Sequence, residues 1–146
     1  MNLRRLGFTA LLAALPALTA CETSTVLGFA IGDISGLWLA TTYVYAENAA
    51  GQGAVDLVER DGARFTLVVD NSTNPPIAST TFNDGMGNEV SGGGPVDIVV
   101  GTLEIEGAVF TVDHDGNEMT IVNGSAMFDF GSGSRNAVLT IELERP

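Results

Sequence analysis

The chain has 146 residues, of which six are basic and 18 are acidic, giving a formal net charge of −12 at neutral pH. This length suits one domain with its own core and is too short for two. The acidic balance argues against nucleic acid and anionic lipid surfaces as partners, because phosphates would be repelled. Every basic residue is an arginine, which excludes Schiff-base chemistry by lysine. The single cysteine excludes intrachain disulfides and cysteine-rich metal sites.

The first 20 residues have the layout of a secretion signal. Arg4 and Arg5 form a short cationic start, and the apolar run that follows over 6–18 is too short to span a bilayer. We therefore expect 1–20 to be a signal peptide that is removed on export. Its removal would leave four arginines against 18 acidic residues, a formal charge of −14.

The four residues that span the expected cleavage point resemble the lipobox of bacterial lipoproteins. In that motif an apolar residue and two small residues precede a cysteine that receives diacylglycerol. The resemblance implies that Cys21 is lipidated, which would consume its sulfur as a thioether and exclude thiol catalysis. The alternative is an ordinary signal peptide in which Cys21 happens to lie near the cut. The four residues are Leu18, Thr19, Ala20 and Cys21.

Lipidation would define both the location and the first segment of the mature protein. The resemblance implies an anchor of acyl chains such as palmitate in a bacterial cell-envelope membrane. Glu22, rather than Asp, follows the cysteine, which implies the outer membrane if the host is Gram-negative and follows the enterobacterial sorting rule. Residues 21–34 would then form the lipidated tether and a short, partly apolar connector.

Beyond residue 35 the apolar residues alternate with a period of two, and almost no helical periodicity is present. In 63–70, for example, Phe65, Leu67 and Val69 share one face and polar residues share the other. One apolar face and one polar face indicate an antiparallel sheet. The expected strands are 37–46, 54–60, 63–70, 77–82, 99–106, 108–113, 118–123, 125–130 and 137–145.

Several of these strands are separated by dipeptides of the kind that two-residue hairpin turns require. Their spacing pairs each strand with its neighbour in sequence and predicts an all-β, antiparallel, up-and-down barrel of about eight to nine strands over 35–146. Closure into a barrel removes the free edges of such a sheet. Residues 71–76 and 84–95 are rich in Asn, Gly, Ser and Pro and are expected to be mobile loops. The turn dipeptides are Asp61-Gly62, Glu106-Gly107, Asp115-Gly116 and Asn123-Gly124.

The first expected strand opens with Gly36, Leu37 and Trp38, and the last ends at Arg145. A Gly and a Trp so spaced, with a basic residue on the last strand, resemble the signature of lipocalins and the wider calycin group. The resemblance implies a lipocalin-like barrel in which Arg145 packs over Trp38, beside Gly36, and closes one end. The chain lacks the disulfide and the other signature regions of the core family. The ending of the chain, from Phe128 to Gly131 and on from Ala137 to Arg145, resembles that of small bacterial lipocalin-like lipoproteins of unassigned function, and no ligand can be carried over from them.

No segment has an arrangement typical of catalysis. His114 is the only histidine and is expected to be a solvated residue of a hairpin turn, and one histidine cannot form a two-histidine zinc site. We therefore predict no catalytic residue, no enzyme activity and no cofactor. The same turn is rich in oxygens and is the main calcium candidate, but a calcium loop needs six or more oxygens held at once, so we predict no metal site. The residues of this candidate are Asp113, Asp115, Asn117 and Glu118.

The interior of such a barrel is either filled by side chains, which the mixture of bulky and small inward residues favours, or wide enough for one small ligand. The leading hypothesis is a non-enzymatic, membrane-tethered barrel that binds a small, mostly apolar molecule or has a structural role in the cell envelope. The alternative is an acidic protein-binding module, such as an envelope inhibitor of a basic hydrolase, because the negative charge would attract a cationic protein. The candidate ligand-lining residues are Thr41, Tyr43, Tyr45, Ser79 and Thr81.

Overall fold

The computed structural model describes residues 31–99, 101–105 and 107–146. Cys21, the expected signal and most of the expected tether lie outside the described residues. No helix in the described ranges is long and apolar enough to cross a membrane. The elements in chain order are η1 (Ile31–Ile34), β1 (Gly36–Ala46), β2 (Val55–Asp56), α1 (Leu57–Asp61), β3 (Arg64–Asp70), β4 (Ile77–Asn83), β5 (Glu89–Val99), β6 (Thr102–Ile105), β7 (Ala108–Asp115), β8 (Glu118–Asp129) and β9 (Ser134–Glu144).

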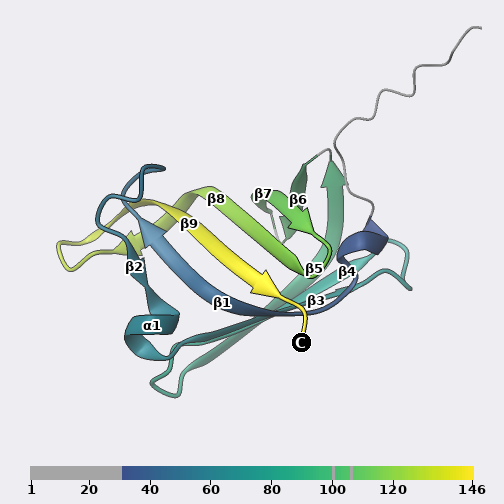
Figure 1. Ribbon diagram of the computed structural model, residues 1–146, viewed down its shortest axis with the longest axis horizontal. Coiled ribbons are helices and arrows are strands. Elements are labelled where there is room, and N and C mark those ends of the chain that lie inside the picture. The colour runs from purple at the N-terminus through teal and green to yellow at the C-terminus, as the bar shows by residue number, and fades with distance from the viewer. Residues whose placement is uncertain (1–30, 100, 106) are drawn as a thin grey trace, which may run out of the picture.

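The strands form one antiparallel sheet that closes on itself (Figure 1). From β3 to β9 each strand pairs with the next one in the chain, and β1 pairs with both β3 and β9. Eight strands therefore make a closed barrel, with β2 as a short additional strand beside β1. This arrangement confirms the predicted all-β, up-and-down antiparallel barrel.

One edge of β1 has two partners in succession. Residues 36–39 pair with β3 and residues 44–45 pair with β2, while the other edge pairs with β9 over residues 39–46. The helix α1 joins β2 to β3. The barrel wall beside β1 is therefore two short strand segments separated by one helical turn.

The helix α1 replaces most of the strand that was expected over 54–60. The side chain of Asp56 caps its start by accepting the N–H of Val58, and Gly62, with φ of 68°, caps its end and donates its N–H to Val58. Asp61-Gly62 is thus a helix end and not a hairpin turn. Asp and Gly are common both at helix caps and in turns, so the dipeptide alone fits either structure.

Two further expectations about strands were wrong. Residues 84–95 were expected to be a loop, but β5 begins at Glu89 and runs through the three glycines. Asn123-Gly124 was expected to be a turn, but the chain passes through it as a β-bulge, so that two expected strands join into β8. The observed total of nine strands still equals the expected total, because β5 adds one strand and the joining of two expected strands into β8 removes one.

A second β-bulge, in β1, changes which side chains face the interior. The register shifts between Ala40 and Thr42, so that Trp38 and Tyr43 both point inward although strict alternation would put them on opposite faces. The core also includes Ile34, just before the expected domain boundary at residue 35. The largest fully buried side chains are Trp38, Ile34, Leu67, Leu103, Met119, Ile121, Ile141 and Leu143.

Candidate functional site

Trp38 and Arg145 lie together at one end of the barrel. The guanidinium carbon of Arg145 is 4.5 Å from the centroid of the Trp38 ring, and Arg145 Nη2 donates to the carbonyl of Asp33 at 2.5 Å. Trp38 Nε1 donates to the carbonyl of Ile34 at 2.8 Å. A Cβ added to Gly36 would stand 4.0 Å from Arg145 Nη1. The inward parity of Arg145 thus brings it onto the indole, and we call this the closed end of the barrel.

His114 also belongs to the closed end. Its ring meets the Trp38 ring edge to face, with centroids 5.6 Å apart, and its Nε2 lies 3.1 Å from the carbonyl oxygen of Gly116. The side chain is half-buried, so the expectation of a solvated turn histidine was wrong. On β7 it shares parity with Phe110 and Val112, and that alternation was the sequence signal that could have placed it inside.

The barrel interior contains a cavity of about 220 Å³. Its lining is apolar apart from the hydroxyl groups of Tyr43 and Thr80, and it includes residues from seven strands. The sequence favoured an interior filled by side chains, but the structure leaves a cavity at this point. The lining residues are Tyr43, Phe65, Thr80, Ile105, Ala108, Phe110, Ile121, Leu139 and Ile141.

Tyr43 is the principal polar group of the cavity. Its ring contacts Phe65, Phe82 and Tyr45, with centroid separations of 5.5, 5.0 and 5.6 Å. Burial raises the pKa of Tyr43 well above the ordinary value of a phenol, and the neighbouring Tyr45 adds to this shift. Tyr43 consequently remains a neutral hydroxyl group at any physiological pH.

A row of aromatic rings continues from the cavity toward the β8–β9 hairpin. Tyr45 stacks on Phe128 with centroids 4.3 Å apart and an interplanar angle of 11°, and Phe128 meets Phe130 at 4.9 Å. The guanidinium of Arg135 lies 4.8 Å from the Phe130 ring and forms an ion pair with Glu47 at 2.6 Å. These rings occupy the end of the barrel opposite to Trp38, and no sequence pattern marks them as a group, because they come from different strands.

Three of the five expected lining residues point away from the interior. Thr41, Ser79 and Thr81 lie on the outer face of the barrel. The bulge in β1 displaces Thr41, and on β4 the inward positions belong to the buried Ala78 and to Thr80. Of the two tyrosines, one lines the cavity and the other is packed behind it.

The calcium candidate is part of the β7–β8 hairpin. Asp115 pairs with Glu118 across the turn, and the carbonyl of Asn117 accepts the backbone N–H of Arg145 at 3.0 Å. Asp113 lies further back on β7. Among the described residues, no group of three or more His, Cys, Asp or Glu side chains is placed to hold a metal ion.

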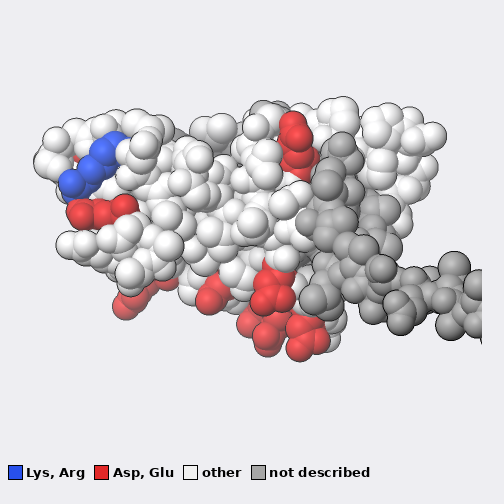
Figure 2. All heavy atoms as spheres, turned by 90° about the horizontal axis from the view of Figure 1, so that it is seen from above, with Lys and Arg blue, Asp and Glu red and all other residues white. Residues whose placement is uncertain are grey.

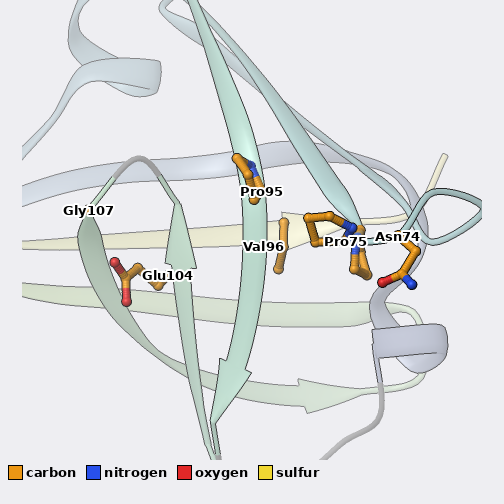
Figure 3. Close-up of a pocket in the computed structure, with 7 residues that line it drawn as sticks. Asn74, Pro75, Pro95, Val96, Glu104 and Gly107 are labelled. Carbon is orange, nitrogen blue, oxygen red and sulfur yellow. The ribbon is translucent and has the colours of Figure 1, made fainter.

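A larger depression, of about 590 Å³, lies on the outer surface of the barrel (Figure 3). Prolines from the loop before β4 and from β5 form much of it, and its one carboxylate comes from β6. It combines no nucleophile with a base and therefore offers no catalytic arrangement. Its lining residues are Asn74, Pro75, Pro76, Pro95, Val96, Glu104 and Gly107.

Comparisons of the chain with models of protein families, with curated proteins and with solved structures find no match. Inference about its function therefore depends on the geometry of its own residues. In that geometry the interior cavity beside Tyr43 is a site with an apolar lining and two hydroxyl groups, inside the barrel that Trp38 and Arg145 close at one end.

Proposed function

We propose that this protein is a non-enzymatic, lipocalin-like barrel that binds one small, mostly apolar molecule in its interior cavity. The observation that carries the proposal is the cavity of about 220 Å³ beside Tyr43. An eight-stranded barrel is just wide enough to hold one small ligand. Apolar walls supply the affinity of such a site, and a few polar groups set the orientation of the ligand.

The volume of the cavity limits the size of the ligand. A dry protein cavity of about 150 Å³ binds benzene, whereas pockets for drug-sized molecules are about 300–1,000 Å³. The cavity lies between these values, so we infer a ligand of one or two rings, or a short chain of equivalent volume. One polar group on this ligand would meet the hydroxyl of Tyr43 or Thr80.

The chemistry of the cavity supports binding rather than catalysis. Tyr43 is the one titratable side chain among the lining residues, and burial raises its pKa. A phenol that stays protonated at neutral pH is a hydrogen-bonding group and not a general base. We therefore assign Tyr43 a role in orienting the ligand.

The proposal also includes a lipid tether at Cys21 in a bacterial cell-envelope membrane. It is supported by the signal-like sequence over 1–20 and by the four residues that end at the cysteine. In a bacterial host, the intact mass of the mature protein should include a diacylglyceryl group. Cys21→Ser should abolish this mass and leave the signal uncleaved. A mature wild-type protein without an acyl mass would contradict the tether.

Two neighbouring residues of β7 allow a direct test of the cavity. Ala108 lines the cavity, whereas Val109 is exposed on the outer surface. Ala108→Leu should fill the cavity, and Val109→Leu is the matched control. With phenol and indole as probes, we expect the melting temperature of the wild type and of Val109→Leu to rise, because a ligand at about 100 times its Kd stabilises by about 2.7 kcal/mol. Ala108→Leu should not respond.

Two outcomes would contradict the binding proposal. An equal response of Ala108→Leu and Val109→Leu would mean that the probes bind elsewhere. The absence of any shift in the wild type, with either probe or with a short-chain alcohol at millimolar concentration, would favour a structural role in the cell envelope.

A further inference from the structure

A surface on the outside of the barrel brings three carboxylates together. Glu118 on β8 and Glu144 on β9 are register partners directly opposite each other, and Glu142 lies two residues along β9 on the same face. All three side chains are exposed. Like charges directly opposite each other destabilise a sheet. In the isolated molecule this arrangement therefore lowers the stability of the fold.

No basic side chain of the described residues forms an ion pair with these glutamates. Arg60 and Arg135 form ion pairs with other acids, and Arg145 is held against the closed end of the barrel. Arg64 lines a different hollow, with residues of β3, β4 and β5. The described part of the chain has four arginines against 16 acidic residues, so an excess of negative charge is inevitable. The overall composition does not, however, require that three of these charges lie together on neighbouring strands.

The three glutamates surround a hollow of about 210 Å³ on the outer surface, which Thr41 and Thr120 also line. The hydroxyl of Thr41 donates to the carbonyl of Glu142 at 3.3 Å. The hollow has the volume of several water molecules. The end of one long side chain of a partner fits such a space.

An apolar row adjoins the glutamates on the same outer face. Leu37 and Leu39 on β1 are each 41% exposed, and Val68 on β3 is 37% exposed. Leu37 and Val68 are register partners, and Leu39 is the register partner of Glu144. The apolar and acidic rows are therefore directly adjacent.

We define these two rows as the acidic–apolar face, which spans β3, β1, β9 and β8. Figure 2 shows carboxylates gathered along one side of the molecule, the side that faces the reader in Figure 1, where β1 and β9 run. Basic atoms are visible in this view only at one end. The residues of the acidic–apolar face are Leu37, Leu39, Val68, Glu118, Glu142 and Glu144.

We propose that the acidic–apolar face is the docking site of a basic protein. A cationic side chain of the partner enters the hollow between the glutamates, and an apolar residue of the partner covers Leu37 and Val68. A second copy of this chain would bring the same charges and would be repelled, as would an anionic lipid surface. This inference is independent of the cavity, because the face lies on the other side of the barrel wall.

The first test separates the position of the charges from their number. The probes are two basic proteins of known structure, egg-white lysozyme and horse cytochrome c, added to the full-length protein. The face variant Glu118→Gln/Glu142→Gln/Glu144→Gln is compared with Glu59→Gln/Glu89→Gln/Glu104→Gln, which has the same net charge and changes exposed glutamates elsewhere. Calorimetry at low ionic strength should show a loss of at least about tenfold in affinity for the face variant, and about twofold or less for the control.

The second test concerns the apolar row. Leu39→Ser/Val68→Ser should weaken binding by several-fold in high salt as well as in low salt, because apolar contact is not screened. Val109→Ser/Met127→Ser changes two exposed apolar residues outside the face and should leave the affinity unchanged. Circular dichroism of each variant checks the fold, and the glutamine variant of the face should melt at a higher temperature than the wild type.

Three results would overturn the docking proposal. The two glutamine variants could lose affinity equally, the apolar variants could leave affinity unchanged, or neither basic protein could bind the wild type at low ionic strength. Ala108→Leu, which fills the cavity, should keep the affinity for the basic probes. The failure of one proposal is therefore distinguishable from the failure of the other.

Discussion

Arg145 lies on the indole of Trp38, with its guanidinium carbon 4.5 Å from the ring centroid, and the same guanidinium bonds to the carbonyl of Asp33. Trp38 is on β1 and Arg145 follows β9 directly, and these two strands pair to close the barrel. The contact therefore joins the two ends of the folded chain. The strength of this contact therefore reports how firmly the first and last strands of the barrel are held together.

The Trp38–Arg145 contact should be energetically coupled. A cation–π contact contributes about 0.5–2 kcal/mol, so a double-mutant cycle of Trp38→Phe and Arg145→Met should give a coupling of at least about 0.5 kcal/mol in denaturant unfolding. Trp38→Ala should cost about 3–5 kcal/mol, because it also removes a large buried ring. Additive effects of the two conservative changes would contradict the coupling.

Asp56 should stabilise the barrel through hydrogen bonds at the gap between β2 and β3. Its Oδ1 accepts the N–H of Val58 at 2.9 Å and the N–H of Tyr43 at 3.1 Å. Asp56→Ala leaves both donors without this acceptor and should cost about 1–3 kcal/mol. Asp56→Asn keeps an oxygen in place and should cost clearly less. Equal losses in urea unfolding would show that the negative charge, rather than the acceptor, is what matters.

Tyr43 should make the protein sensitive to alkali. Burial raises its pKa above the ordinary 10.0, so above that pH the unfolded chain releases this proton while the folded chain keeps it. Stability should therefore fall as the pH rises above about 10, with a contribution from Tyr43 of about 1.4 kcal/mol per pH unit.

Tyr43→Phe is the control for this alkaline loss. The chain has no lysine and only two tyrosines, so few other groups titrate in the same range. The variant should lose less stability than the wild type between about pH 10 and pH 12, measured by urea unfolding at each pH. Parallel stability profiles for the two proteins would refute the role of Tyr43.

Gly93 should be required for the packing of β5 against β4. A Cβ at this position would stand 2.6 Å from the carbonyl oxygen of Ala78, whereas a Cβ at Gly124 would meet nothing within 4 Å. Gly93→Ala should therefore cost about 1–3 kcal/mol through strain, and Gly124→Ala should be within about 0.5 kcal/mol of the wild type. Similar melting temperatures for the two variants would mean that β5 can move away from β4 without loss.

Strand alternation and the turn dipeptides predicted the barrel, and the resemblance to the lipocalin signature, together with the parity of Arg145, predicted its contact with Trp38. In β9 the inward series Leu139, Ile141 and Leu143 leads directly to Arg145, and no irregularity interrupts it. The bulge in β1 could not be predicted in the same way. Threonine, tyrosine and valine fit either face of a strand, so the sequence around Thr41 does not reveal a change of face. The assignment of lining residues therefore failed at Thr41.

The remaining differences have local causes that a single sequence does not reveal. The helix α1 has five residues, which is too short for a helical periodicity to be visible. The glycines of β5 are typical of a loop, yet Gly93 is needed because the strand passes so close to Ala78. The cavity depends on the sizes of residues from seven strands and is a property of their packing in three dimensions.

The pairing of β1 with β9 also determines when the barrel can close during synthesis of the chain. Hairpins from β3 onward can form as the chain is synthesised, but one edge of β1 has no partner until residues 138–144 exist. Contacts of such long sequence separation carry a large loop-closure entropy and make folding slow. A chain that stops before β9 would keep the meander but expose two open edges, which are templates for aggregation. The pairing of the last strand with β1 thus completes folding and, in the same step, removes the open edges through which the chain could aggregate.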